Sequence, residues 1–242
     1  MLSKAQKKII TSLAVKKYRD KEKLFIVEGE KSVKEFLSSH YTVKSVYCTH
    51  NTEEIYPGCE KISATEMEQI SNLKTPSGVL AVIEIPEIIF DKNIFTKELV
   101  IALDNIQDPG NLGTIIRLAD WFGIKNIICT PDTADAYNPK TVQATMGALT
   151  RVNIIYADLL SILKGLDKVS IYGTFLNGEN IYETSLEQNG VVIMGNEGKG
   201  ISTEIEKLVT KKLYIPSFGG GSESLNVAVA TAIVCSEFKR RT

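Results

Sequence analysis

Three glycine-rich junctions between residues 104 and 230 constrain this sequence more than any other feature. They read DNIQDPGNLGTIIRLAD at Asp104–Asp120, IMGNEGKGIS at Ile193–Ser202 and IPSFGGGSESLNVAVA at Ile215–Ala230. Each junction follows a short run rich in β-branched residues, leads into a helical pattern and mixes glycines with polar side chains. Because glycine lets the backbone approach a ligand closely, three such junctions in one domain predict a single composite site.

Apolar runs alternate with helical patterns through the second part of the chain. The runs are residues 99–103, 126–129, 152–156, 170–176, 191–194 and 213–215. Continuous apolar strands that alternate with helices predict an α/β fold with a mainly parallel sheet covered on both faces. Ligands bind such sheets at the carboxyl ends of the strands, and the three junctions fall there.

The first 90 residues predict a smaller α/β unit. Ser63 and Glu66 fit a capping box, in which their side chains satisfy free backbone donors at the start of a helix. Pro86 and the irregular stretch 87–98 separate this unit from the rest. Helices are also expected over residues 3–18 and 31–39, and strands over residues 25–27, 43–49 and 78–85.

Composition indicates a soluble globular protein with an uneven distribution of charge. The 242 residues carry a net charge of −1 and are 43% hydrophobic, and no run approaches the ~20 apolar residues of a membrane span. Residues 1–34 hold ten Lys or Arg against four acids, a surplus of six, so the remainder carries about −7. This asymmetry fits either a basic surface for a polyanion or a solvated helix face. The N-terminal MLSKAQKKIITSLAVKK is typical of an amphipathic helix and not of a signal peptide.

The four cysteines predict neither a metal site nor a disulfide framework. They are widely spaced and form no CxxC pair, and the whole sequence contains only two histidines that could complete a metal site. We therefore expect four reduced thiols, as is usual in the cytosol.

The first junction carries the most chemistry. Asn111 is expected to cap the following helix and Gly123 to end it. Arg117 lies off the apolar face of that helix, where it either pairs with Asp120 or binds an anion such as a phosphate. The apolar face comprises Leu112, Ile115, Ile116, Ala119 and Phe122, and the turn formers or substrate contacts are Asp104, Asn105 and Asp108.

The second and third junctions add polar side chains among glycines. Glu197 lies between glycines in GNEGKG, which forms either one wall of a pocket or an ordinary tight turn, and Thr203 with Glu206 fits a second capping box. The third junction continues from its three glycines into Ser222, Glu223, Ser224 and Asn226, and its backbone N–H groups suit a phosphate or carboxylate. Neither GxxxxGK[ST], GxGxxG nor GxSxG is present.

Two classes of function fit these residues. One is an enzyme that uses a nucleotide-like cofactor and a polyanionic substrate, and the other is an RNA-binding protein without catalysis. The concentration of Asn, Arg, Glu and Ser at strand ends favours the enzyme, because a binding module would place basic and aromatic residues there. A dehydrogenase that uses NAD is disfavoured by the lack of GxGxxG.

Taken together, the three junctions resemble the three motifs of the SpoU/TrmH family of RNA 2′-O-ribose methyltransferases, within the SPOUT class. Their order and separation agree with that family. The segments NPKTVQATMGALTRV, FIVEGEKSVKEFL and TPSGVLAV also resemble it, so the likeness covers nearly the whole chain.

The resemblance implies a fold, a cofactor and partners. Residues 1–90 would form an RNA-binding domain similar to ribosomal protein L30e, and residues 97–242 a catalytic domain that ends in a deep trefoil knot. The implied reaction moves a methyl group from S-adenosylmethionine to a ribose 2′-OH, of ribosomal RNA in preference to transfer RNA, without a metal. A homodimer with its active site near the subunit interface is implied as well, whereas the cysteines and the lack of a long apolar run predict a cytoplasmic protein without membrane contact. The alternatives are a transfer-RNA enzyme and an inactive relative that only binds RNA.

The resemblance also implies roles for individual residues. Arg117 would hold the adjacent phosphate and assist loss of the 2′-OH proton, either as a perturbed base or by a route through phosphate or water. Two departures from the family pattern are a third loop, residues 215–225, that is one residue longer, and Gln143 where a basic residue is common. The implied catalytic residues are Asn111, Arg117, Glu197, Ser224 and Asn226. The implied cofactor contacts are Leu176, Gly195, Asn196, Ile215 and Leu225.

Overall fold

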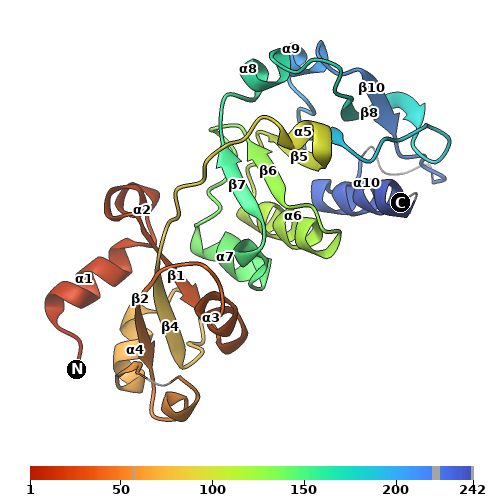
Figure 1. Cartoon of the computed structure of the whole chain (residues 1–242). Coiled ribbons are helices and arrows are strands. Elements are labelled where there is room, and N and C mark those ends of the chain that lie inside the picture. The colour runs from red at the N-terminus through yellow and green to blue at the C-terminus, as the bar shows by residue number, and fades with distance from the viewer. Residues whose placement is uncertain (57, 220–223, 241–242) are drawn as a thin grey trace. The chain divides into compact units, whose positions relative to one another are not determined.

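The computed structural model describes residues 1–56, 58–219 and 224–240 and divides into two compact units (Figure 1). Unit 1 comprises Met1–Glu87 and Asp135–Thr150, and unit 2 comprises Ile88–Ala134 and Arg151–Thr242. The domains expected from the sequence, 1–90 and 97–242, are continuous in the chain, whereas unit 1 also includes residues 135–150.

Unit 1 is built on a four-stranded sheet in the order β1-β4-β2-β3. Strand β4 pairs antiparallel with β1 and β2, and the short β3 pairs parallel with β2. The three longer strands match the predicted ones. Strand β3 was not predicted, because two residues are too few to show the alternation of apolar and polar residues that marks a strand. The elements are α1 (Lys4–Ser12), α2 (Lys16–Glu22), β1 (Leu24–Glu28), α3 (Glu30–Leu37), β2 (Val43–Cys48), η1 (Glu53–Ile55), β3 (Glu60–Lys61), α4 (Ala64–Ile70), β4 (Val79–Glu84), α7 (Pro139–Thr145) and η2 (Ala148–Thr150).

The predicted helix over residues 3–18 is divided in two. Val15 adopts an extended conformation, with φ −102° and ψ 129°, between α1 and α2. The Thr11 and Ser12 hydroxyls donate hydrogen bonds to backbone carbonyls of the preceding turn, a pattern that competes with helix continuation. The break lets Leu13 and Arg19 both become buried within unit 1, which one straight helix would not favour.

Residues 135–150 pack with unit 1 through specific contacts. The Phe25 and Tyr137 ring centroids lie 4.8 Å apart, and the Tyr41 hydroxyl donates to the Leu149 carbonyl oxygen at 3.1 Å. Burial raises the pKa of Tyr41 to about 12. These contacts explain why a segment between two strands of unit 2 belongs to unit 1.

The prediction that all four cysteines are reduced thiols is wrong for two of them. Cys48 and Cys59 form a disulfide across a sequence separation of 11 residues. Cys48 ends β2, and the pairing of Tyr47 with Glu60 brings Cys59 beside it. The CxxC rule missed this bond because strand pairing, and not sequence spacing, joins the two cysteines. Cys129 and Cys235 are free and buried.

Unit 2 contains a six-stranded sheet in the order β10-β8-β9-β5-β6-β7. All five neighbouring pairs are parallel, which confirms the predicted parallel α/β sheet. Its strands match the six predicted apolar runs. The elements are α5 (Ile94–Lys97), β5 (Leu99–Asp104), α6 (Pro109–Trp121), β6 (Asn126–Cys129), β7 (Asn153–Tyr156), α8 (Leu159–Lys164), β8 (Ile171–Asn180), β9 (Gly190–Gly195), α9 (Thr203–Glu206), β10 (Lys211–Tyr214) and α10 (Val227–Arg240).

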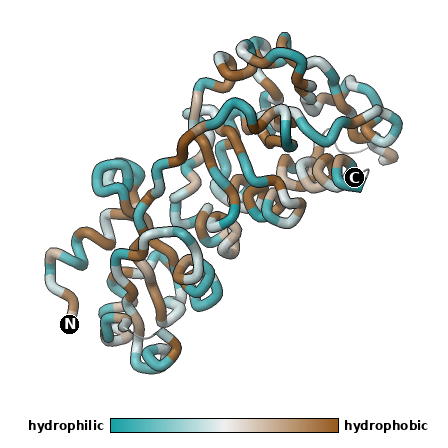
Figure 2. Tube along the Cα trace, viewed as in Figure 1, coloured by the Kyte–Doolittle hydropathy of each residue, from teal (hydrophilic) through white to brown (hydrophobic). Residues whose placement is uncertain are grey.

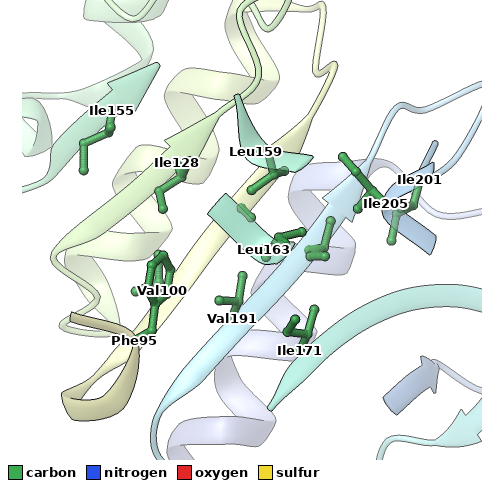
Figure 3. Packing of buried hydrophobic residues seen from close by; sticks show 12 residues of the cluster. Phe95, Val100, Ile128, Ile155, Leu159, Leu163, Ile171, Val191, Ile201 and Ile205 are labelled. Atoms are coloured by element: carbon green, nitrogen blue, oxygen red, sulfur yellow. The ribbon is translucent and has the colours of Figure 1, made fainter. Parts of the chain in front are cut away.

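Helices cover both faces of this sheet, as expected. Apolar residues concentrate along the strands (Figure 2), and one face packs against α8, where Leu159 and Leu163 meet Val100 and Val191 (Figure 3). Helix α10 lies behind the strands in the same view and packs against α6 and β9. Because β5 and β9 are parallel neighbours, with Asp104 opposite Gly195, the first two junctions leave the same edge of the sheet.

Candidate active site

Asn111 connects all three junctions. Its Nδ2 donates a hydrogen bond of 2.8 Å to Glu197 Oε1 in the second junction. Its Oδ1 accepts one of 3.0 Å from Asn226 Nδ2 in the third. Three residues separated by up to 115 positions therefore meet through one carboxamide. We call Asn111, Glu197 and Asn226 the amide relay.

Asn111 is free for this role because another residue caps α6. The prediction that Asn111 caps the helix is wrong: Asp108 is the N-cap, and its Oδ1 accepts from the Asn111 backbone N–H at 2.9 Å. Aspartate before a proline at the first helical position is a favourable start for a helix. The expected end is confirmed, since Gly123 follows the last helical turn with φ +67°.

Asn226 is fixed by the helix that it precedes. Its Oδ1 accepts hydrogen bonds from the backbone N–H groups of Ala228 at 2.9 Å and Val229 at 3.3 Å at the start of α10. The capping oxygen leaves the amide nitrogen pointing to Asn111. The same side chain therefore starts a helix and orients the amide relay.

Asp104 and Asn105 attach the second junction to the end of β5. The buried Asp104 carboxylate accepts a hydrogen bond of 2.7 Å from the Ser202 backbone N–H. The Asn105 carbonyl accepts one of 2.8 Å from Asn196 Nδ2. The sequence left Asp104 and Asn105 open between turn formation and substrate contact, and the structure uses both to position a loop. An acidic residue as the last position of a buried strand is the signal that points to such an anchor.

Asn105 carries two unusual features at this position. It adopts a left-handed conformation with φ +60°, and its buried Oδ1 has no hydrogen-bond partner among the described residues. Left-handed backbone and unsatisfied polar atoms both carry a cost and concentrate at functional sites.

The second junction is a compact loop held by its own hydrogen bonds. Asn196 Oδ1 accepts hydrogen bonds from the backbone N–H groups of Gly198 and Lys199, both at 3.0 Å. A Cβ at Gly195 would lie 2.3 Å from the Gly200 carbonyl carbon, so only glycine fits there. The predicted capping box of Thr203 and Glu206 is wrong, because Ser202 is the N-cap of α9 and makes no side-chain cap. Ser202 already donates its N–H to Asp104, which starts the helix one residue earlier.

Arg117 and Ser224 lie outside the amide relay. Arg117 is exposed on α6 and has no hydrogen bond or ion pair among the described residues. Its proposed partner Asp120 instead bonds Arg151 Nε and Nη2 at 2.9 and 3.0 Å, so the guanidinium of Arg117 is available to an anion. Ser224 is exposed without a hydrogen bond to any described residue. The roles of both remain predictions.

The residues implied as cofactor contacts offer apolar surface and backbone. Leu176 is 72% and Leu225 48% exposed, and Ile215 is half-buried at the end of β10. Exposed leucines beside polar loops suit the faces of an adenine ring, and Gly219 has open space where a Cβ would lie. Asn196 uses its side chain to shape the loop, so any contact with a cofactor would come from its backbone. These residue types fit S-adenosylmethionine. The predicted longer loop falls partly on residues 220–223. These residues, which include Ser222 and Glu223, lie outside the described residues.

Other chemistry finds little support in the described part of the chain. No group of three or more His, Cys, Asp and Glu side chains there is arranged to hold a metal ion. Burial raises the pKa of Cys235 to about 12 and that of Cys129 further still, so both thiols are unsuited to nucleophilic attack. None of the described helices is long and apolar enough to span a bilayer.

Comparison with known proteins defines the class. The model of the SpoU rRNA Methylase family matches residues 98–236, and that of an MRM3-like substrate binding domain matches residues 4–81. The chain therefore belongs to the SpoU rRNA methylase family.

Individual relatives cover both units. The chain is 35% identical to the 23S rRNA (guanosine(2553)-2′-O)-methyltransferase RlmP of Bacillus subtilis, over 92% of this chain and 91% of that protein. A solved TrmH-family protein from Porphyromonas gingivalis is 38% identical, with a TM-score of 0.88 over 100% of both chains. The rRNA methyltransferase from Sinorhizobium meliloti, solved with AdoMet bound, is 29% identical with a TM-score of 0.88, over 100% of this chain and 96% of that one.

Proposed function

We propose that this protein transfers the methyl group of S-adenosylmethionine to a ribose 2′-oxygen of ribosomal RNA. The observation that carries the proposal is the amide relay, which joins one side chain from each of the three motifs at the carboxyl edge of the sheet. Family membership and 35% identity to a 23S rRNA 2′-O-methyltransferase over nearly the whole chain support the reaction and the substrate class.

The coverage of the relatives favours ribosomal over transfer RNA. The relatives that match both units include the rRNA enzymes of Bacillus subtilis and Sinorhizobium meliloti. A solved TrmH/SpoU tRNA modifying enzyme from A. aeolicus, at 30% identity, covers 60% of this chain. The match to an MRM3-like substrate binding domain lies within unit 1.

The side chains of this protein would act mainly by positioning the substrate. Arg117, exposed and without a carboxylate partner among the described residues, would bind the phosphate next to the target ribose. The proton of the 2′-OH would leave to a phosphate oxygen or to water, because an arginine side chain in proteins retains its own proton. The amide relay would hold the three loops in fixed positions relative to one another, so that the 2′-oxygen, methyl carbon and sulfur lie in line. S-adenosylmethionine, when bound, supplies an electrophilic methyl group.

Further features of the family complete the proposal. We infer that the protein is a homodimer whose interface includes α6 and α10, which pack together and expose Trp121 at 83% and Val229 at 50%. We also infer that the C-terminal part of unit 2 forms a trefoil knot, an inference supported by the packing of α10 against β9 and α6. Light scattering of Trp121→Glu tests the dimer: a monomer is expected, and a persistent dimer would exclude α6 from the interface.

The N-terminal domain and the cellular location follow from the same proposal. Unit 1 would be an L30e-like RNA-binding domain, and the protein would work in the cytoplasm, where ribosomal RNA is available. Fractionation of cells tests the location, and co-purification with a membrane fraction would contradict it.

The experiment that tests the function combines labelling with mapping. Protein, unmodified 23S rRNA transcript and methyl-labelled S-adenosylmethionine are incubated together, and the RNA is then digested with alkali. A 2′-O-methyl group protects the neighbouring phosphodiester, so label is expected in an alkali-resistant dinucleotide. Label in transfer RNA alone would favour the alternative substrate, and binding without label would indicate an inactive relative.

A further inference from the structure

Helices α1 and α2 present five exposed lysines, four of which have no acidic partner among the described residues. Lys4, Lys8, Lys16 and Lys17 are exposed and form no ion pair among the described residues. Lys21 is exposed and pairs only with its neighbour Glu22. We call these five residues the lysine surface. Two exposed lysines elsewhere in unit 1 are instead paired across the fold, Lys44 with Glu84 at 2.6 Å and Lys61 with Glu53.

A buried arginine attaches α2 to the rest of unit 1. Arg19 is only 2% exposed, and its Nε and Nη2 donate to Asp135 Oδ2 at 3.0 and 2.6 Å. Its Nη1 donates to the Leu13 carbonyl oxygen at 2.7 Å. Since all of these groups belong to unit 1, Arg19 ties both ends of the α1–α2 connection to one folded body. With Arg19 turned inward, the helix period directs Lys17 and Lys21 outward.

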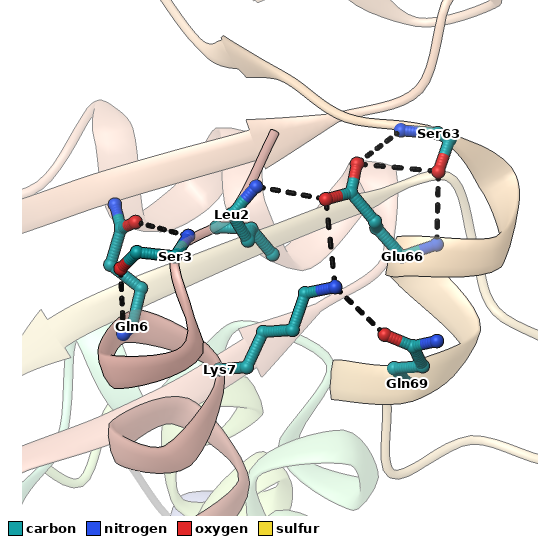
Figure 4. A network of polar contacts seen from close by, with 7 residues as sticks. All are labelled: Leu2, Ser3, Gln6, Lys7, Ser63, Glu66 and Gln69. Atoms are coloured by element: carbon teal, nitrogen blue, oxygen red, sulfur yellow. Dashed lines mark hydrogen bonds and ion pairs between the residues drawn. The ribbon is translucent and has the colours of Figure 1, made fainter.

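Polar contacts fix α1 in the same way. The Leu2 backbone N–H donates to Glu66 Oε1 at 2.8 Å, and Lys7 Nζ lies 3.6 Å from the same oxygen (Figure 4). Lys7 also donates to Gln69 Oε1 at 2.9 Å. Ile10 is buried in the core cluster of unit 1. The segment is therefore a docked pair of helices, and its lysines are held out from a rigid base.

The chemistry of this surface fits the RNA backbone. A protein with net charge −1 that concentrates a surplus of six positive charges in its first 34 residues attracts polyanions at that place. Tyr18, 42% exposed between Lys17 and Arg19, offers an aromatic face on which an unpaired base can stack. The apolar face of α1 packs inside unit 1, so it is not available for insertion into a lipid surface.

We propose that the lysine surface and Tyr18 form a docking site for the phosphate backbone of the RNA substrate. The inference rests on the proposed function and extends it, because it assigns substrate capture to two helices of unit 1, remote in sequence from all three motifs. The contacts made by the lysines are independent of base sequence. They supply affinity and orientation, and recognition of the target nucleotide lies elsewhere.

The test compares two variants that lose the same charge. Lys16→Gln with Lys17→Gln removes two unpaired lysines of the surface, and Lys44→Gln with Lys74→Gln removes two exposed lysines elsewhere in unit 1. RNA affinity is measured by fluorescence anisotropy with an unmodified 23S rRNA transcript fragment at several salt concentrations. The first variant should bind about tenfold more weakly, and the slope of log affinity against log salt should fall by about 1.4, since each lost phosphate contact removes about 0.7. The second variant should match the wild type.

Three further readouts separate the possible outcomes. Tyr18→Ala should weaken binding of unpaired RNA by about fivefold or more, while thermal unfolding and S-adenosylmethionine affinity stay at wild-type values for every variant. Equal RNA affinity of the two lysine variants would overturn the inference. It would also be overturned if Lys16→Gln with Lys17→Gln lost binding to anionic phospholipid vesicles but kept its affinity for RNA. If the wild type binds RNA through these lysines but transfers no methyl group, the docking site stands and the proposed function fails.

Discussion

The substitution Asn111→Asp tests the amide relay most sharply. It keeps the size of the side chain and the oxygen that accepts from Asn226, and it replaces the donor to Glu197 by a second carboxylate. The lost hydrogen bond, 2.8 Å long in the wild type, is worth about 1.5 kcal/mol for a charged acceptor near the surface. Two unit charges at that separation repel by about 1.5 kcal/mol more, even in bulk water.

The combined penalty of about 3 kcal/mol predicts a loss of roughly 100-fold in methyl transfer. Single-turnover methylation of unmodified 23S rRNA transcript measures this loss without a contribution from product release. Circular dichroism should change little, because Asn111 and Glu197 lie at the surface and the two loops can separate to relieve the repulsion, at the expense of the active geometry. The matched control is Asp120→Asn on the same helix, which breaks the exposed pair with Arg151 and should leave the rate within about threefold.

A compensating change separates positioning from direct contact. Adding Glu197→Gln to Asn111→Asp restores a hydrogen bond of reversed polarity and the original net charge. The double variant should recover to within about tenfold of the wild type. Wild-type activity of Asn111→Asp alone would refute the relay, and absence of rescue by Glu197→Gln would refute its role as a mutual positioning device.

Three further outcomes are expected. Hydrogen bonds from two backbone N–H groups hold the pKa of Glu66 at about 2, below its usual 4.5, so its contribution to stability is present above pH 4.5 and lost as the pH falls toward 2. Glu66→Gln should flatten the dependence of thermal unfolding on pH in that window, and an unchanged acid limb would contradict this. Reduction of the Cys48–Cys59 bond, which closes a sequence separation of 11 residues, should lower the unfolding free energy by about 2–3 kcal/mol in denaturant titrations. The double variant Cys48→Ser with Cys59→Ser should show the same unfolding free energy with and without dithiothreitol. Gly195→Ala would place a Cβ 2.3–2.7 Å from backbone atoms of its own loop and should weaken S-adenosylmethionine binding at least tenfold by calorimetry. Gly165→Ala, whose Cβ would meet its nearest neighbour at 3.5 Å outside the three junctions, is its control, and equal affinities would count against the loop geometry.

Periodicity predicted the sheet of unit 2 because its strands are buried on both faces. Runs such as Leu99–Leu103 and Val191–Met194 are continuous and apolar, and the structure confirms them as β5 and β9 with small changes at their ends. The composite site was predictable for a related reason. Parallel strands share one edge for their carboxyl ends, so Asn111 and Glu197 were expected near each other, and they are hydrogen-bonded.

The features that sequence reasoning missed depend on competition between neighbouring groups. Asn111 and Asp108 are both good N-caps, and local preference alone does not decide which one a helix uses. The break before Val15 depends on burial of Arg19 against Asp135, a partner 116 residues away. The Cys48–Cys59 bond depends on a two-residue strand, too short to leave a pattern. In each case the deciding contact is tertiary, and the sequence contains both partners without indicating that they meet.

The position of the methyl group in the product tests the central claim most directly. Unmodified 23S rRNA transcript, treated with this protein and S-adenosylmethionine, can be digested to nucleosides and analysed by mass spectrometry. We expect a single 2′-O-methylated nucleoside, with the added mass on the ribose fragment, and none when Arg117→Ala replaces the wild type. A methyl group on the base, or full ribose methylation by Arg117→Ala, would contradict the account.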